Sequence, residues 1–118
     1  MQWDASVNAG FSTGKSWIGV SPDYALVNVA NQINDPQSML SVYQKIIGIR
    51  NKYQALQYGD YESLNFNDDV IQYVRKLGDK RIKVLIWFKA NAVLKSREVG
   101  RELLKGGDSE NGFAIYEI

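Results

Sequence analysis

Residues 9–16 read AGFSTGKS and contain the residue types of a phosphate-binding loop: Ala, four residues, then Gly-Lys-Ser. Such a loop binds phosphate because it connects a buried strand to the N-terminus of a helix, where backbone N–H groups and the lysine converge. The eight residues before it hold no apolar run of strand length, and Gly19 and Pro22 interrupt the segment after it. We therefore interpret the stretch as a loop and expect no nucleotide site.

Carboxylates are the only strong acid/base candidates, because the 118 residues include no His and no Cys. Those of the first two-thirds of the chain are mostly spread through expected loops and turns: Asp4, Asp23, Asp35, Asp60, Glu62, Asp68 and Asp69. The adjacent pair Asp68 and Asp69 precedes an expected strand, so a turn explains it better than a metal site. Since the carboxylate separation of a glycosidase is set by its fold, no catalytic pair is assigned. We expect no catalytic residue, metal ligand or cofactor site.

The composition argues against polyanionic and membrane partners. Fourteen basic and thirteen acidic residues give a net charge of +1, which predicts no nucleic-acid partner. The segment LGDKRIK, followed by Trp87 and Phe88, is interpreted as a charged hairpin tip beside core aromatics. The longest apolar run, VLIWF, is far too short to span a bilayer. Sugar stacking on Trp3, Trp17 or Trp87 is a further option, but burial in a core is the expected default for each.

The elements that position these residues begin with an irregular segment over residues 1–34. A helix is predicted over 36–54, with Asp35 as its cap and Pro36 at its first position. Its broad apolar stripe consists of Met39, Leu40, Tyr43, Ile46, Ile47, Arg50 and Tyr53. Gly48 costs the helix about 1 kcal/mol relative to Ala, which suggests a close packing contact there.

After the helix the period changes to two, which predicts antiparallel strands. The expected strands cover 56–64, 69–77, 81–89 and 112–118, with weaker candidates at 90–96 and 101–106 and a turn at Gly78-Asp79. An α+β chain with a small β-sandwich follows. The stripe is wide for one helix beside a small sheet, which suggests that the chain starts partway through a larger body.

The opening residues resemble a motif of the α-amylase family of glycoside hydrolases, family 13, in its oligo-1,6-glucosidase, dextran glucosidase and trehalose-6-phosphate hydrolase group. The matching positions are Met1, Gln2, Trp3, Asp4, Ala9, Gly10, Phe11, Trp17, Ile18, Pro22 and Tyr24. The helix signature Tyr43, Lys45, Ile46, Ile47 and Arg50 and the exit Leu56, Tyr58, Gly59 and Tyr61 are also similar to that group. The resemblance is specific over residues 1–77 and looser from Arg81 onward, where Trp87 stands before Phe88 in place of the family's usual Asn.

The resemblance implies a fold and a site. Residues 1–54 would form the loop after strand eight and the last helix of a (β/α)₈ barrel, and residues 55–118 an antiparallel β-sandwich C-terminal domain. Met1, Gln2, Trp3, Asp4 and Phe11 would border the substrate site. Lys15 and Ser16 match no phosphate-binding position of the family.

The resemblance also implies a function. Family members of this kind are retaining α-glucosidases, whose Asp nucleophile, Glu acid/base and second Asp lie upstream of the opening motif. We therefore expect a C-terminal structural part of a cytoplasmic α-glucosidase acting on α-1,6 bonds in short oligosaccharides, inactive alone and without a cofactor. The alternative is a stand-alone carbohydrate-binding or interaction module. The expected partners are the missing catalytic barrel, or a second copy through the helix face of Met39, Tyr43, Ile46, Ile47 and Tyr53.

Overall fold

The computed structural model describes residues 1–89 and 100–118, which form two compact units, Met1–Gln44 and Lys45–Ile118. The first unit contains the 3₁₀ turn η1 (Val7–Gly10), the short helix α1 (Val29–Gln32) and the start of helix α2 (Met39–Lys52). The expected irregular segment over 1–34 is therefore confirmed, apart from η1 and α1. The predicted strand at 90–96 lies outside the described residues.

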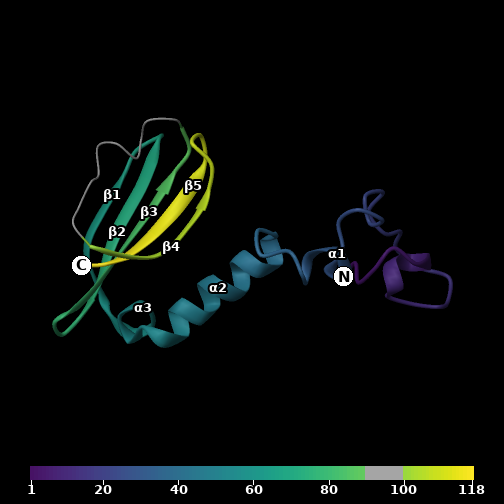
Figure 1. Cartoon of the computed structure of the whole chain (residues 1–118), viewed down its shortest axis with the longest axis horizontal. Helices are drawn as coiled ribbons and strands as arrows, with labels where there is room; N and C mark the ends of the chain where they lie inside the picture. The colour runs from purple at the N-terminus through teal and green to yellow at the C-terminus, as the bar shows by residue number, and fades with distance from the viewer. Residues whose placement is uncertain (90–99) are drawn as a thin grey trace. The chain divides into compact units, whose positions relative to one another are not determined.

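The second unit is built on one antiparallel sheet of five strands in the order β1-β2-β3-β5-β4 (Figure 1). The strands are β1 (Asp60–Phe66), β2 (Val70–Leu77), β3 (Lys80–Trp87), β4 (Arg101–Gly107) and β5 (Gly112–Glu117). The predicted strands at 69–77, 81–89, 101–106 and 112–118 are confirmed. A sandwich needs a second sheet, and all five strands of the described residues belong to one, so the sandwich itself is not confirmed.

Strand β3 lies at the centre of the sheet, and both of its faces carry buried apolar side chains. Ile82 and Val84 pack with Ala55 and Ile115 on one face. Leu85 and Trp87 form the second cluster, with Ala114. A short continuous apolar run such as VLIWF is typical of a strand that is buried on both faces.

The predicted helix over 36–54 was wrong at both ends. Asp35 Oδ1 accepts a hydrogen bond from the Gln37 N–H at 2.8 Å, so Asp35 closes a turn instead of capping the helix. The Ser38 hydroxyl accepts from the Ser41 N–H at 3.2 Å, and the helix begins directly after it. Pro36 therefore lies in the turn before the helix.

The predicted strand over 56–64 was wrong in its first half, because the chain first forms a second helix, α3 (Gln54–Tyr58). Ala55 is buried against the sheet, and this packing outweighs the local alternation of the sequence. Gly59 then ends the helix. A Cβ at this position would lie 2.5 Å from the Ala55 carbonyl oxygen and 2.6 Å from that of Lys76, so only glycine fits.

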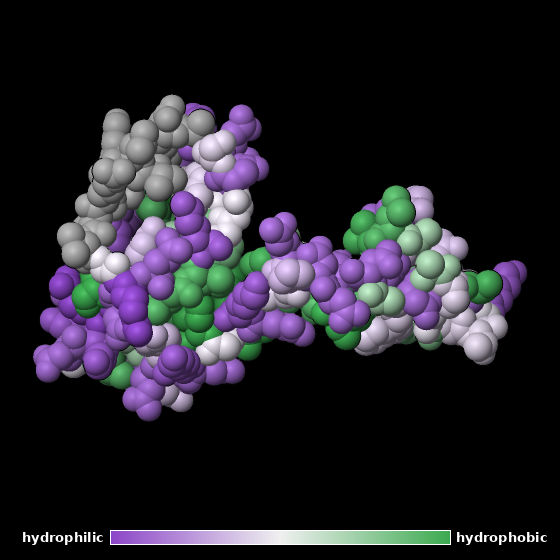
Figure 2. All heavy atoms as spheres, viewed as in Figure 1, coloured by the Kyte–Doolittle hydropathy of each residue, from purple (hydrophilic) through white to green (hydrophobic). Residues whose placement is uncertain are grey.

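The apolar stripe of α2 divides into a packed and an exposed part. Tyr53, which follows α2, packs against the sheet core and so does not belong to the exposed face that was predicted, and Ile46 is half-buried. Ile49 of α2, which was not part of the predicted stripe, packs against the sheet core as well. Met39, Tyr43 and Ile47 are 66%, 61% and 54% exposed, and Figure 2 shows apolar residues at the surface of both units. Within residues 1–89 and 100–118 the expected close contact at Gly48 is absent, since a Cβ there would meet none of their atoms within 4 Å. No helix in the described ranges is long and apolar enough to cross a bilayer.

Candidate functional site

The residues expected to border a substrate site begin with an extended segment held against the start of α1. The backbone carbonyls of Gln2 and Trp3 accept hydrogen bonds from the N–H groups of Val29 and Ala30 at 3.0 and 2.9 Å. Asn28 stabilises the start of α1, because its side-chain oxygen accepts a hydrogen bond from the Asn31 N–H at 2.9 Å and caps the helix. Sequence segments 27 residues apart are thereby joined.

The chain then reverses through three successive residues in the left-handed region. Asn8, Ala9 and Gly10 have φ values of +55°, +57° and +66°. The Ala9 carbonyl accepts from the Trp3 N–H at 2.8 Å and from the Asp4 N–H at 3.3 Å, which closes the turn onto the opening motif. Non-glycine residues in this region are strained, and such strain clusters at functional sites.

Asp4 fills the inside of this turn. Its Oδ1 accepts from the N–H and the hydroxyl of Ser6 at 2.8 and 2.5 Å. The Ser6 hydroxyl and then the Ser6 N–H hold the pKa of the Asp4 carboxyl below its usual value of 3.8. A Cβ on Gly10 would lie 2.7 Å from the carboxylate oxygens, so the turn needs glycine there. Asp4 is therefore an ionised turn acceptor and is unsuited to act as a general acid near neutral pH.

Asn8 connects the turn to the loop that follows it. Its side-chain N–H₂ donates to the carbonyls of Ser12 and Gly14 at 2.9 and 2.7 Å, and its Oδ1 accepts from the Ser16 hydroxyl at 2.6 Å. Sequence reasoning missed this residue. The signal that could have found it is an Asn directly before an Ala-Gly turn, since Asn tolerates the left-handed region better than most residues.

The structure excludes the context of a phosphate-binding loop, as the sequence indicated. Residues 9–16 begin within the 3₁₀ turn η1 and do not follow a strand, and no α-helix begins before Val29. Lys15 is exposed at the surface of the loop. The stretch is therefore a surface loop, and its glycines serve turns.

Several aromatic side chains stand at the surface of this unit. Trp17 is 96% exposed, Phe11 is 68% exposed and Trp3 is 48% exposed. The default expectation of burial was thus wrong for Trp17 and Trp3. It is confirmed for Trp87, whose Nε1 donates to the Asp108 carbonyl at 3.1 Å. The loop can offer aromatic faces and backbone polar groups to a ligand, whereas its carboxylate is already engaged.

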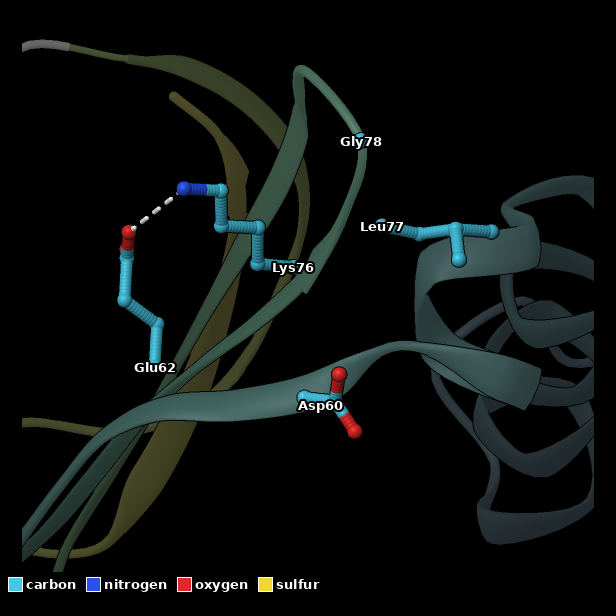
Figure 3. Close-up of a pocket in the computed structure, with 5 residues that line it drawn as sticks. All are labelled: Asp60, Glu62, Lys76, Leu77 and Gly78. Carbon is cyan, nitrogen blue, oxygen red and sulfur yellow. Dashed lines mark ion pairs between the residues drawn. The ribbon is translucent and has the colours of Figure 1, made fainter.

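A shallow pocket of about 320 Å³ lies in the second unit, at the β1–β2 end of the sheet (Figure 3). Its lining residues are Asp60, Glu62, Lys76, Leu77 and Gly78. Glu62 forms ion pairs with Arg81 at 2.6 Å and Lys76 at 3.5 Å. The hydrogen bond from Arg81 is the main reason why the pKa of Glu62 lies below 4.5, so this carboxylate is also held ionised. The pocket has no aromatic lining and does not resemble a sugar-cleaving site.

The acidic pair before β2 belongs to a turn, as predicted. Asn67 Oδ1 accepts from the N–H groups of Asp69 and Val70 at 2.8 and 2.9 Å. The Asp69 carboxylate pairs with Lys89 at 2.6 Å. Across residues 1–89 and 100–118, no three carboxylate, His or Cys side chains come together in a metal-binding group.

Comparison with known proteins gives a consistent picture. Residues 1–59 match the family described as alpha amylase, catalytic domain. Over 85 residues the chain is 45% identical to the glucan 1,6-alpha-glucosidase of Streptococcus pneumoniae serotype 4, a match that covers 72% of this chain and 16% of the relative. It is 39% identical over 89 residues to the oligo-1,6-glucosidase of Parageobacillus thermoglucosidasius, covering 75% of this chain and 16% of that enzyme. The chain thus corresponds to about one-sixth of the length of these relatives.

A solved structure extends the likeness to almost the whole chain. The trehalulose synthase MutB from Pseudomonas mesoacidophila MX-45 has a TM-score of 0.85 and 31% sequence identity to it. The match covers 98% of this chain and 24% of that chain. The strands after residue 59, which lie beyond the family match, therefore also have a counterpart in a solved structure of related sequence.

Proposed function

Because the chain belongs to the α-amylase family of glycoside hydrolases, family 13, we propose that it forms the C-terminal structural part of a retaining α-glucosidase. The enzyme would hydrolyse α-glucosidic bonds, above all α-1,6 bonds, in short oligosaccharides. The names of two relatives, a glucan 1,6-alpha-glucosidase and an oligo-1,6-glucosidase, support this substrate class. We expect the enzyme to work in the cytoplasm and to need no cofactor.

The observation that carries the proposal is the match of residues 1–59 to a catalytic-domain family by a stretch that contains three carboxylates, Asp4, Asp23 and Asp35. Asp4 and Asp35 accept hydrogen bonds within turns, and Glu62 is ion-paired. A retaining glycosidase needs two carboxyl groups about 5–5.5 Å apart, one of them as a protonated acid. In this proposal the catalytic residues lie in other parts of the enzyme. This chain borders the sugar site and packs against the barrel.

In this proposal Met1, Gln2, Trp3, Asp4 and Phe11 border the sugar site. The boundary between barrel and C-terminal domain is proposed after residue 54, where α3 begins and the chain turns to the sheet. The exposed stripe of Met39, Tyr43 and Ile47 is proposed to pack against the remainder of the barrel. An apolar helix face of this kind is stabilised when a second layer covers it.

A chimeric enzyme tests the proposal. The stretch of the Streptococcus enzyme that matches this chain is replaced by the corresponding residues of this chain, and glucose release from isomaltose is measured. We expect hydrolysis by the chimera and none by the 118-residue chain alone. A second chimera, carrying an unrelated β-sheet domain in the same position, is the control. Hydrolysis by the isolated chain above a matched blank would contradict its assigned inactivity.

The exposed aromatic side chains favour a second candidate function, a carbohydrate-binding module that acts without a barrel. Trp17 and Phe11 present open faces of the kind that stack on ligands. Isothermal titration of the chain with isomaltose and with dextran distinguishes the two functions. Saturable heat that is lost in a Trp17→Ala variant would favour the binding module over the structural role.

A further inference from the structure

We infer that Asn8 is a positioning residue that fixes the conformation of the loop at residues 11–16, which borders the sugar site in the function proposed above. That the loop borders a sugar site rests on the proposed function. The rest of the inference is argued from the geometry of the first unit. Asn8 is absent from the set of bordering residues that the opening motif predicts. It acts through the loop and touches no reacting atom.

The backbone of Asn8 favours an asparagine. Its φ of +55° lies in the left-handed region, where Asn is several-fold enriched over other non-glycine residues. Ala9 continues in the same region with its side chain fully buried. Two adjacent strained residues persist only where surrounding contacts determine the conformation.

The side chain of Asn8 supplies such contacts. Both amide hydrogens are used, because Nδ2 donates to the carbonyls of Ser12 and Gly14. The amide oxygen accepts from the Ser16 hydroxyl. One side chain therefore bonds the loop near its start, its middle and its end, which is close to the full capacity of a primary amide.

The loop that Asn8 holds is bounded by exposed aromatic residues. Phe11 stands at its beginning and Trp17 directly after its end. Loss of the Asn8 contacts would let both ends of the loop move, and a ligand would then have to order them on binding. Because the loop borders a site and carries no carboxylate that could act in glycoside hydrolysis, the change should appear in KM and leave kcat nearly unchanged.

Trypsin gives a direct assay of the loop, since Lys15 is an exposed tryptic site within it. The test compares the 118-residue chain with two variants. Asn8→Gly keeps access to positive φ and removes the side chain. Asn8→Asp keeps an acceptor for Ser16 and removes both donors. Cleavage after Lys15 tracks the population of the open loop, so we expect about a tenfold faster cut in both variants.

A matched control separates loop opening from general loosening of the unit. Asn31 also donates from its side chain to a backbone carbonyl, that of Leu26 at 2.9 Å, at some distance in sequence from the loop. Asn31→Asp should leave cleavage after Lys15 near the wild-type rate. An equal acceleration in Asn31→Asp, or no acceleration in either Asn8 variant, would overturn the inference.

The second part of the test uses the active chimera described above. Asn8→Gly in the chimera should raise KM for isomaltose about tenfold while kcat stays within about twofold. An unchanged KM together with fast tryptic cleavage would overturn the role at the sugar site. A chimera that is inactive with Asn8 in place would instead count against the proposed function, and with it the sugar-site role. The tryptic assay would still decide whether Asn8 holds the loop.

Discussion

At the scale of single residues, Arg75 shows how a side chain joins the helix α3 to the sheet. Its Nε and Nη2 both donate to the Gly59 carbonyl, at 3.0 and 2.6 Å. Its guanidinium carbon lies 4.7 Å from the centre of the Tyr61 ring, and Tyr61 meets Tyr73 edge-on at 5.6 Å. A planar guanidinium can make the forked bond and the ring contact together, whereas an ammonium cannot.

We therefore predict that Arg75→Lys lowers the free energy of unfolding by about 1–2 kcal/mol, although the charge is kept. Urea unfolding followed by circular dichroism measures the change. Arg81→Lys is the matched control, because Arg81 pairs with Glu62 at the surface and such pairs contribute about 0–1 kcal/mol. Equal losses in both variants would show that the fork and the ring contact add nothing.

Glu62 predicts an acid dependence of stability. Its pKa is lowered in the folded state, first by the hydrogen bond from Arg81 and then by the charges of Arg81 and Lys76. A lowered folded pKa contributes stability that is complete above the unfolded value, here near 4.5, and is lost as the pH falls through the folded pKa. The window of this loss therefore lies below pH 4.5.

The measurement for Glu62 is the melting temperature from neutral pH down to pH 3, for the wild type and Glu62→Gln. The wild type should be the more stable protein at neutral pH, and the difference should shrink as the pH falls below about 4.5. High salt should also shrink it, because exposed ion pairs are screened. A difference that stays constant with pH would contradict an electrostatic role for Glu62.

At the scale of elements, helix α2 could be stabilised by a substitution at Gly48. No atom of the described part of the chain lies within 4 Å of a Cβ at this position, so an added methyl group meets no obstacle there. Gly48→Ala should raise the free energy of unfolding by about 0.5–1 kcal/mol, because glycine loses more chain entropy in a helix than alanine does.

Gly59→Ala is the matched control for that variant. It should destabilise the chain, since its Cβ would lie 2.5 Å from a backbone oxygen. Thermal unfolding of the two variants gives the comparison. A destabilised Gly48→Ala would mean that a part of the protein outside the described residues packs closely on this side of the helix.

The elements also show how far the sequence predicts this fold. Strands with period-two alternation or a continuous apolar run, such as β2 and β3, are recognisable because the sheet buries those same side chains. The helix start was missed because Asp35 and Ser38 are both good caps, and only the tertiary arrangement selects Ser38. Helix α3 was missed because Ala55 packs on strands that follow it in sequence.

The same holds at the candidate site. The opening motif predicts that Met1, Gln2, Trp3, Asp4 and Phe11 border the site, because its residue types and spacing are specific to the family it resembles. It did not reveal Asn8, whose importance comes from a positive φ and from bonds to Ser12, Gly14 and Ser16. A positive φ is a property of the folded backbone, so the residue types of the sequence show only that it is possible at Asn8 and do not predict it.

At the scale of the whole molecule, the exposed stripe of α2 predicts self-association of the isolated chain. Met39, Tyr43 and Ile47 recur every four residues and are each more than half exposed. Contiguous apolar surface of this kind favours association in water. We expect the wild-type chain to dimerise or form larger species as its concentration rises, as measured by light scattering.

A triple variant, Met39→Gln, Tyr43→Gln and Ile47→Gln, should reduce this association strongly, because it removes the apolar surface and keeps the helix. The control replaces three even more exposed apolar residues of the first unit, Val7, Ile18 and Leu26, by Gln and should associate as the wild type does. The chimera adds a sharper comparison. If the barrel covers the stripe, the chimera should stay monomeric with the same three residues in place, because a stripe that is packed against the barrel cannot also contact a second copy. A wild-type chain that remains a monodisperse monomer at high concentration would contradict the prediction that the exposed stripe drives self-association, and would show that the stripe is stable in water without a covering barrel.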